Sequence, residues 1–390
     1  MATVHSLMYK MLPPVGEPIR LGPRSDPPEF TGFHSVWTQS GTAALALAVR
    51  LAMDQRPDVA RPEVLIPAHG CPDLVAAVRF AGAIPILVDI GPEDPGFDPA
   101  SLEQAWTKAT VAVVAVNFLG IRERVHDLAH AATTRNTWLI EDSAQWYPEP
   151  QADENEPFSP TDAVILSFGR GKPVSLLGGG ALLVREGRES NPALESLKAA
   201  PNEWLPALKI ALYNQLLQPR WYGLIGRNPL LSVGGTHYAP LVGVQAMASW
   251  RLELLGSNAA AWLDRDRWRE TAISEMLISC EAVAVNLPHL LKERTRRLLR
   301  YPLLCRDRET RDRLLAQLVT AGLGATAMYR EALPWVPGVA PVLDVIPALP
   351  GARAFAEHLL TLPVHDGVSR KDIECMEEVI RSEVTIVLEN

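Results

Sequence analysis

Asp142 and Lys172 are the two residues of this sequence best placed to act together chemically. Asp142 follows the apolar stretch 137–140 and Glu141, and Lys172 lies between the apolar run 163–166 and three glycines at 178–180. Burial lowers the pKa of an ammonium group, and the neutral amine attacks an aldehyde to form a Schiff base. A buried carboxylate keeps a pyridine nitrogen protonated. The pair therefore predicts a site for pyridoxal 5'-phosphate, with Lys172 on the aldehyde carbon and Asp142 at the ring nitrogen.

Ser40, Gly41 and Thr42 open an alanine- and leucine-rich segment that we expect to form a buried helix over 42–53. The free N–H groups and the dipole at a helix start attract anions, so these residues are candidates for binding the cofactor phosphate. An ordinary Ser or Thr helix cap is the alternative, and on these residues alone it is favoured. Asp142 is equally a candidate cap, and most lysines are surface residues. The prediction of a pyridoxal phosphate site therefore rests on all of these signals occurring together in one order.

Apolar strands expected at 63–67, 84–89, 111–116, 138–140, 163–168 and 181–184 alternate in their first part with helices at 73–81, 99–108 and 125–135. This alternation predicts an α/β fold with a mostly parallel sheet that is covered by helices on both faces. Such sheets bind ligands at the carboxyl ends of their strands. Asn117, Asp142 and Lys172 all follow strands, so we expect one edge of the sheet to collect them.

The 390 residues suggest more than one domain. Residues 1–35 are predicted to form an irregular arm and 36–245 a large cofactor-binding domain that includes a helical insertion at 186–235. Residues 246–390 are predicted to form linking helices, over 243–257 and 260–277, and a small α/β domain. That domain would contain a strand at 301–304 and helices at 310–321 and 370–381.

Composition narrows the function classes. The net charge is −8 with both signs interspersed, which argues against a nucleic-acid-binding surface. Four scattered cysteines without CxxC spacing predict reduced thiols in a cytoplasmic protein rather than disulfides or a zinc site. We see no signal peptide and no apolar run of the ~20 residues that a membrane span requires. The leucine- and tryptophan-rich stretch 205–231 suggests weak contact with a membrane or protein partner, or a helical pair buried in a dimer.

Several of these segments, in the same order, resemble the DegT/StrS-type sugar aminotransferases, which are fold-type I pyridoxal phosphate enzymes. The resemblance covers about 36–382. It is carried by Ser40-Gly41-Thr42-Ala43-Ala44-Leu45, Ile66-Pro67, Gly82 with Val88-Asp89-Ile90, 116–120, Glu141-Asp142-Ser143-Ala144-Gln145, Ser167-Phe168 with Lys172, Gly179-Gly180, Gln245-Ala246, Arg300-Tyr301-Pro302 and Leu362-Pro363-Val364-His365. It implies a large domain with a mostly parallel seven-stranded sheet and a smaller C-terminal α/β domain.

The resemblance also implies residue roles. Lys172 would hold the cofactor and later move a proton between substrate carbon and cofactor, Asp142 would pair with the pyridinium nitrogen, and Gln145 would approach the phenolic oxygen. The residues implied to contact the cofactor are Ser40, Gly41, Thr42, His69, Cys71, Asn117, Asp142, Gln145, Ser167 and Lys172.

Some positions depart from the family pattern. The family's ring-stacking aromatic residue is replaced near Cys71, where His69 is a candidate for stacking and equally a candidate core or surface histidine. Asn117 stands where the family has a histidine. Thr236-His237-Tyr238 replaces the segment by which a neighbouring subunit reaches the phosphate.

The expected activity is transfer of an amino group from an amino acid, with glutamate the family's usual donor, to a nucleotide-linked keto sugar. The expected setting is cell-envelope or exopolysaccharide biosynthesis, and the expected assembly is a homodimer with sites at the subunit interface. Lys172 argues against the related sugar dehydratases, which lack this lysine. Two alternatives stay open: a pyridoxal phosphate enzyme of another class (a lyase or a non-sugar transaminase), or a non-catalytic scaffold that kept the fold.

Overall fold

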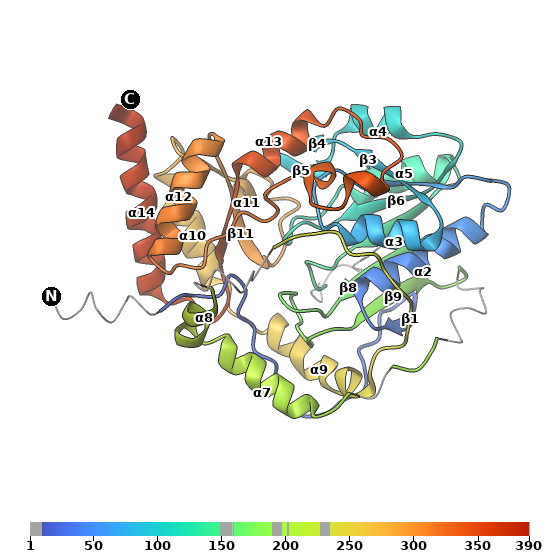
Figure 1. Ribbon diagram of the computed structural model, residues 1–390, viewed down its shortest axis with the longest axis horizontal. Helices are drawn as coiled ribbons and strands as arrows, with labels where there is room; N and C mark the ends of the chain where they lie inside the picture. The colour runs from blue at the N-terminus through green and yellow to red at the C-terminus, as the bar shows by residue number, and fades with distance from the viewer. Residues whose placement is uncertain are drawn as a thin grey trace.

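A seven-stranded sheet organises the larger part of the molecule (Figure 1). The computed structural model describes residues 10–148, 158, 160–188, 197–200, 203–226 and 235–389. The strand order is β1-β9-β8-β7-β6-β2-β3, and the five strands from β8 to β3 run parallel while β9 and β1 are antiparallel to their neighbours. This confirms the predicted mostly parallel sheet. The strands are β1 (Phe33–Thr38), β2 (Glu63–Pro67), β3 (Ile84–Val88), β6 (Thr110–Val116), β7 (Trp138–Asp142), β8 (Ala163–Ser167) and β9 (Gly180–Arg185).

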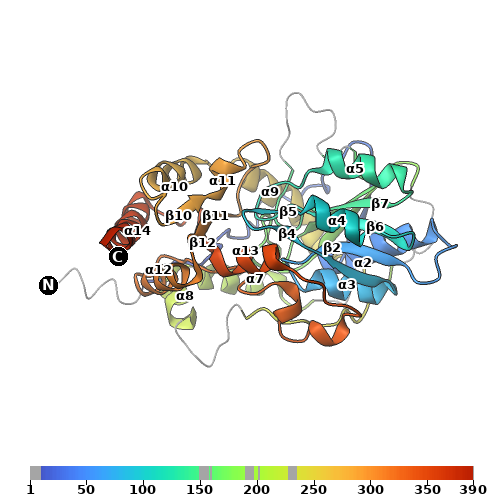
Figure 2. The ribbon, with the colours of Figure 1, turned by 90° about the horizontal axis from the view of Figure 1, so that it is seen from above.

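Helices cover both faces of this sheet because its strands are apolar on both sides. Val64 and Ile66 belong to the core under α2 (Gly41–Asp54) and α3 (Asp73–Ala81). Leu65, between them in β2, belongs to the core under α4 (Pro99–Ala105) and α5 (Val125–Thr134). Figure 2 shows the two helix pairs on opposite sides of the strands. This double covering is the arrangement that the continuous apolar strands predict.

A three-stranded antiparallel sheet forms the centre of the C-terminal part, in the order β10-β11-β12. Its core is shared with α10, α12 and α14, which lie together at one end of the molecule in Figure 1. The elements are β10 (Ala284–Asn286), β11 (Arg300–Cys305), β12 (Leu359–Pro363), α10 (Trp268–Ile278), α11 (Leu287–Leu290), α12 (Arg308–Thr320), α13 (Pro350–His358) and α14 (Arg370–Glu389). The short strands β4 (Ile90–Gly91) and β5 (Asp94–Phe97) form a separate hairpin.

One aspartate joins this C-terminal part to the large sheet. The Asp89 carboxylate, just after β3, accepts hydrogen bonds from the backbone N–H groups of Gly351 and Ala352 at 2.9 and 2.7 Å. Both N–H groups belong to the first turn of α13, where intrahelical partners are lacking and the dipole favours negative charge. Asp89 therefore anchors α13 to the end of β3, an edge strand of the large sheet.

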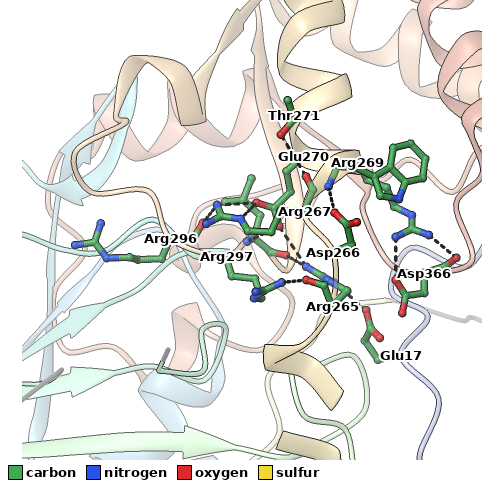
Figure 3. A network of polar contacts seen from close by, with 12 residues as sticks. Glu17, Arg265, Asp266, Arg267, Arg269, Glu270, Thr271, Arg296, Arg297 and Asp366 are labelled. Atoms are coloured by element: carbon green, nitrogen blue, oxygen red, sulfur yellow. Dashed lines mark hydrogen bonds and ion pairs between the residues drawn. The ribbon is translucent and has the colours of Figure 1, made fainter. Parts of the chain in front are cut away.

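The linking helices differ from their predicted bounds. α9 covers Ser249–Leu263, and the chain then breaks before α10, whereas a continuous helix over 260–277 was predicted. Asp266 Oδ1 accepts a hydrogen bond from Trp268 N at 2.8 Å, just where the new helix begins. Within the break, the Arg265 guanidinium bonds to Glu17 of the N-terminal arm and to the Leu298 carbonyl, both at 2.8 Å (Figure 3). A break between the two linking helices was predicted at 258–259, and the structure places it at 264–267. Periodicity alone carries no information on such distant partners, so it did not fix the position of the break.

The hairpin of α7 (Pro206–Leu216) and α8 (Pro219–Gly226) presents an apolar surface. Its exposed side chains include Trp204 (82 %), Leu208 (62 %), Leu212 (59 %), Trp221 (48 %) and Leu224 (57 %). Residues 227–231 of the segment singled out in the sequence lie outside the described residues. None of the helices in the described part of the chain has the length and apolar character to cross a membrane.

Candidate active site

Asp142 and Lys172 come together at the carboxyl end of the large sheet. Asp142 is the last residue of β7, and its Oδ1 accepts a hydrogen bond from Ala144 N at 2.9 Å. Lys172 is half-buried in the turn that follows β8. Burial raises the pKa of the Asp142 carboxyl above its usual value, while the Ala144 N–H and the charge of Lys172 act in the opposite direction. The two side chains are thus close enough for their charges to interact, as the sequence predicted.

The start of α2 lies directly against the end of β8. A Cβ added to Gly41 would be 2.8 Å from Ser167 Cβ, and one added to Gly180 would be 2.5 Å from Gly41 N. Both glycines are therefore needed for this close backbone approach. Ser167 also lies beside Lys172, because a Cβ on Gly169 would be 3.8 Å from Ser167 Oγ and 3.9 Å from Lys172 Cγ. The free N–H groups of the helix start and the Ser167 hydroxyl form a cradle that suits a phosphate.

Two residues of the same helix start have local partners. Ser40 Oγ accepts a hydrogen bond from Ala43 N at 3.2 Å, so Ser40 is the N-cap of α2. Thr42 Oγ1 donates to Asp73 Oδ2 at 3.0 Å. Asp73 was not singled out from the sequence, and its charge also raises the pKa values of Asp142 and Cys71. A carboxylate therefore stands beside the cradle and partly offsets its preference for anions.

Tyr329, which sequence reasoning missed, completes the site from the C-terminal part of the chain. Its buried hydroxyl accepts a hydrogen bond from Gln145 Nε2 at 3.2 Å, and Gln145 Oε1 accepts one from Leu119 N at 3.0 Å. Cys71 lies near Tyr329, because each group influences the pKa of the other. Burial raises the pKa of the Cys71 thiol to about 11, and the nearby charge of Lys172 acts in the opposite direction. Cys71 and Gln145 thus both lie beside Tyr329, and their predicted contact with the cofactor stays a prediction.

His69 lies behind Tyr329 in an aromatic cluster. Its ring packs edge-on against Phe118, Tyr329 and Phe355, with centroid separations of 5.3, 5.9 and 5.0 Å. Its Nε2 contacts the Tyr329 carbonyl oxygen at 3.2 Å. Desolvation lowers the pKa of His69 to about 4, so the ring is neutral at physiological pH. These contacts describe a core histidine, one of the alternatives left open by the sequence, and its role in stacking on the cofactor stays a prediction.

Asn117 is engaged in a buried polar network at the ends of β6 and β7. Its Nδ2 donates to Glu141 Oε1 and Ser143 Oγ, both at 2.7 Å, and its Oδ1 accepts from Glu123 N at 3.1 Å. The Glu141 carboxylate also pairs with Arg122 at 3.1 Å. These bonds hold the strand that carries Asp142, so Asn117 supports the site from behind, and its predicted contact with the cofactor stays a prediction.

The chemistry of these groups fits pyridoxal phosphate. The cradle at Gly41 and Ser167 suits the phosphate, Asp142 suits a protonated ring nitrogen, and Lys172 suits an aldehyde. Among the residues that the structure describes, no cluster of His, Cys, Asp or Glu has the geometry of a metal site. A mostly parallel α/β sheet with these groups at one edge is the arrangement of a fold-type I pyridoxal phosphate-dependent enzyme.

Comparison with known families gives the same class. Residues 29–198 and 257–381 match the model of the DegT/DnrJ/EryC1/StrS aminotransferase family, and the chain belongs to this family. The family depends on pyridoxal phosphate. A Streptococcus pneumoniae protein solved in its PMP form has a TM-score of 0.64 and 21% sequence identity, with 91% of this chain and 87% of that chain covered. The same protein has also been solved in a PLP form.

Curated relatives match over shorter stretches. The chain is 30% identical over 165 residues to dTDP-3-amino-3,4,6-trideoxy-alpha-D-glucose transaminase of Micromonospora megalomicea subsp. nigra, covering 42% of this chain and 43% of the relative. It is 34% identical over 112 residues to L-glutamine:2-deoxy-scyllo-inosose aminotransferase of Micromonospora echinospora, covering 29% of this chain and 26% of the relative. The matches therefore span less than half the length of these relatives.

Proposed function

We propose that this protein is a pyridoxal phosphate-dependent aminotransferase that moves an amino group from an amino acid to a keto sugar carried on a nucleotide. The observation that carries the proposal is the placement of Asp142 and Lys172 together beside the Gly41–Ser167 cradle. The dTDP-sugar transaminase among its relatives supports the choice of acceptor. Glutamate is the proposed donor, and glutamine, which appears in the name of the second relative, is the donor to compare with it. Cell-envelope or exopolysaccharide biosynthesis is the proposed setting.

Each residue then has a definite task. When bound, the cofactor supplies an electron sink for the carbon that carries the transferred amino group. The Asp142 carboxylate would keep the proton on the ring nitrogen, and the Lys172 amine would hold the cofactor and move a proton at the reacting carbon. Ser167 and the N–H groups of α2 bind the phosphate. The bond from Leu119 N fixes the Gln145 amide so that its Nε2 points to Tyr329.

A second candidate function is a pyridoxal phosphate reaction of another class. Two observations favour it. The Asp73 carboxylate accepts a hydrogen bond from the Thr42 hydroxyl, and Cys71 offers little area for ring stacking. A transaminase for a non-sugar ketone belongs to this candidate, and the inosose acceptor named for the Micromonospora echinospora relative supports it. A protein that binds no cofactor despite Lys172 would instead be the non-catalytic scaffold.

We further propose a cytoplasmic homodimer with sites at the subunit interface. The extended segment 235–246 supports a dimer, since none of it is buried, half of its residues are exposed, and Val242 is 94 % exposed in the single chain. The exposed apolar side chains of α7 and α8 would be buried in this dimer, and a contact with a membrane is the alternative for them. Light scattering gives the oligomeric state, and flotation with liposomes of the wild type against a Leu217→Glu, Trp221→Glu double variant tests the membrane contact. Equal, negligible flotation of both proteins would rule that contact out.

The absorption spectrum of the protein with added pyridoxal phosphate tests the main proposal. We expect a visible cofactor band that bleaches on addition of glutamate, and we expect Lys172→Ala to abolish transamination. A band that responds to no amino acid would favour the second candidate function. A wild-type protein without any cofactor band would favour the non-catalytic scaffold. Ordinary turnover by Lys172→Ala would exclude the proposed role of Lys172.

A further inference from the structure

The turn that carries Lys172 is closed at its base by the large sheet. The Phe168 carbonyl oxygen, just after β8, accepts hydrogen bonds from Leu176 N at 2.8 Å and from Gly178 N at 3.2 Å. Between these points the backbone passes through Gly171 with a φ of +72°, a conformation that glycine adopts far more readily than other residues. The base of the turn is therefore fixed by the sheet, whereas the position of Lys172 also depends on the elements that contact the turn from outside.

Tyr213 of α7 contacts this turn from the helical insertion. Its hydroxyl lies 3.4 Å from the hydroxyl of Ser175, a buried residue three positions after Lys172. Desolvation raises the pKa of the Tyr213 phenol, while Ser175, the charge of Arg170 and the backbone of Gly171 act in the opposite direction. The phenol therefore lies beside residues that precede and follow Lys172 in the turn.

The helix that presents Tyr213 is itself held by the N-terminal arm. Asn214, the next residue of α7, binds both backbone groups of Ile19, because its Oδ1 accepts from Ile19 N at 2.9 Å and its Nδ2 donates to Ile19 O at 2.8 Å. Asn258 of α9 binds both backbone groups of Arg20 in the same way, at 2.8 and 3.0 Å. The arm thus ties α7 to α9, so Tyr213 stands on a helix whose position is fixed.

The other helix of this pair, α9, holds the end of the same turn. Arg251 Nε donates to the Leu176 carbonyl oxygen at 3.0 Å. The Arg251 guanidinium also pairs with Glu203, which lies just before α7. The turn is therefore held between α7 and α9, with Arg251 at its end and Tyr213 at the part closer to Lys172.

We propose that Tyr213 is a positioning residue for Lys172 and that it acts through the contact of its hydroxyl with Ser175. The inference rests on the proposed aminotransferase function, in which the Lys172 amine moves a proton at the reacting carbon. Proton transfer requires the two groups at hydrogen-bond distance, so a turn that is held less firmly would place the amine correctly for less of the time. The helix α7 lies outside residues 29–198 and 257–381, so the match to the family does not supply this contact.

The test compares the wild type with Tyr213→Phe, Ser175→Ala and the double variant. Hydrogen exchange of peptides covering 169–178, in the cofactor-free proteins, measures how firmly the turn is held. Bleaching of the cofactor band over a range of glutamate concentrations, in the cofactor-loaded proteins, separates the maximum rate from the half-saturating concentration. Tyr301→Phe is the control, because it removes a phenol hydroxyl that donates within the small sheet.

We expect Tyr213→Phe and Ser175→Ala each to speed exchange in 169–178 and to slow the maximum rate of bleaching, both by about 3-fold to 10-fold. The half-saturating glutamate concentration should stay the same, because the contact does not involve the donor. The double variant should be no worse than either single variant, since all three lack the same contact. Tyr301→Phe should leave exchange of the turn and the bleaching rate unchanged. Melting temperatures show whether each protein is folded, and the two single variants test the contact separately should one of them fail to fold.

Unchanged exchange in the single variants would overturn the inference, as would faster exchange with a normal maximum rate of bleaching. Effects that add in the double variant would also overturn it, because the two hydroxyls would then act independently. A raised half-saturating glutamate concentration with a normal maximum rate would place Tyr213 in donor binding instead. A wild-type protein without a cofactor band would overturn the proposed function itself, whereas a normal wild-type band with indifferent variants would overturn only the role of Tyr213.

Discussion

The Tyr329 hydroxyl accepts a hydrogen bond from Gln145 Nε2 at 3.2 Å, although the two residues are 184 positions apart in the sequence. Gln145 follows β7 of the large sheet, and Tyr329 follows α12 of the C-terminal part. Because the Gln145 carbonyl oxygen is already bonded to Leu119 N, its amide nitrogen must face Tyr329. The bond therefore joins the two parts of the chain at the candidate site.

Tyr329→Phe should weaken cofactor binding by about 2-fold to 10-fold, because it leaves the buried Gln145 amide without its acceptor and so frees it to reorient. A titration of the visible cofactor band measures the effect. Tyr301→Phe is the matched control, since Tyr301 OH donates to Asn286 Oδ1 at 2.8 Å within the small sheet. We expect the control to lower the melting temperature without changing cofactor affinity. Equal cofactor affinity in Tyr329→Phe and the wild type would show that the bond does not position the site.

The shared edge of Asp142 and Lys172 could be predicted from the sequence because it follows from local pattern. Continuous apolar strands separated by helices specify a parallel sheet. The carboxyl ends of parallel strands lie at the same edge of the sheet, independently of the conformation of the loops. The strand β1 was not predicted, because Phe33–Thr38 mixes polar and apolar residues and pairs at an antiparallel edge. The hairpin of β4 and β5 was missed because its strands are very short.

Tyr329, Asp73 and the placement of Tyr213 beside Ser175 could not be predicted, because each depends on contacts between distant segments. Tyr329 lies in a stretch without motif or regular periodicity, and nothing near it in the sequence indicates Gln145 as its partner. Tyr213 stood in the predicted helical insertion, yet only the structure shows that it faces the turn of Lys172. Sequence pattern therefore placed Asp142 and Lys172 at one edge of the sheet, whereas long-range packing decides which other residues surround them.

Gly41→Ala should disrupt the phosphate cradle. The added Cβ would be 2.8 Å from Ser167 Cβ, which is closer than real contacts allow, so β8 and α2 must separate. We expect a loss of about 1–3 kcal/mol of stability and clearly weaker cofactor binding. Gly22→Ala is the control, since a Cβ at Gly22 would meet no atom within 4 Å. Thermal melts with and without pyridoxal phosphate measure both effects, and identical behaviour of the two variants would contradict the close approach of α2 and β8.

Asp142→Asn should stabilise the cofactor-free protein while removing most of its activity. Burial raises the folded-state pKa of Asp142 above the reference value of 3.8, so the folded protein binds this proton more tightly than the unfolded chain. The corresponding stability is full below about pH 3.8 and is lost as the pH rises through the folded-state pKa. At pH 7 the variant should therefore melt higher than the wild type by roughly 2 °C or more.

The same variant should lose turnover, because a neutral amide does not hold the proton on the ring nitrogen. Melting curves of the cofactor-free proteins at pH 7 and near pH 4 test the stability effect, and the difference should shrink at the lower pH. A variant that melts below the wild type at pH 7 would mean that pairing with Lys172 outweighs the desolvation of Asp142.

His365 should make the fold sensitive to mild acid. Its Nε2 contacts the Pro13 carbonyl oxygen at 2.9 Å, and its Nδ1 accepts a hydrogen bond from Gly367 N at 3.1 Å, so the buried ring is neutral and its proton is on Nε2. Desolvation, together with the charges of Arg265 and Arg269, lowers the pKa of His365 to about 4, although the Pro13 bond and Asp366 oppose the shift. Protonation would remove the acceptor for Gly367 and leave a charged ring buried beside the N-terminal arm.

The depressed pKa of His365 destabilises the folded protein as the pH falls. The stability due to His365 is fully present above its unfolded pKa of 6.5 and is lost as the pH falls toward about 4. Calorimetric unfolding near pH 5 should therefore show about one more proton taken up by the wild type than by His365→Gln. The comparison uses proton uptake rather than melting temperature because the variant also loses packing. His34→Gln, at an exposed position in β1, is the control and should match the wild type. Equal uptake by the wild type and His365→Gln would show that His365 does not bind its extra proton on unfolding.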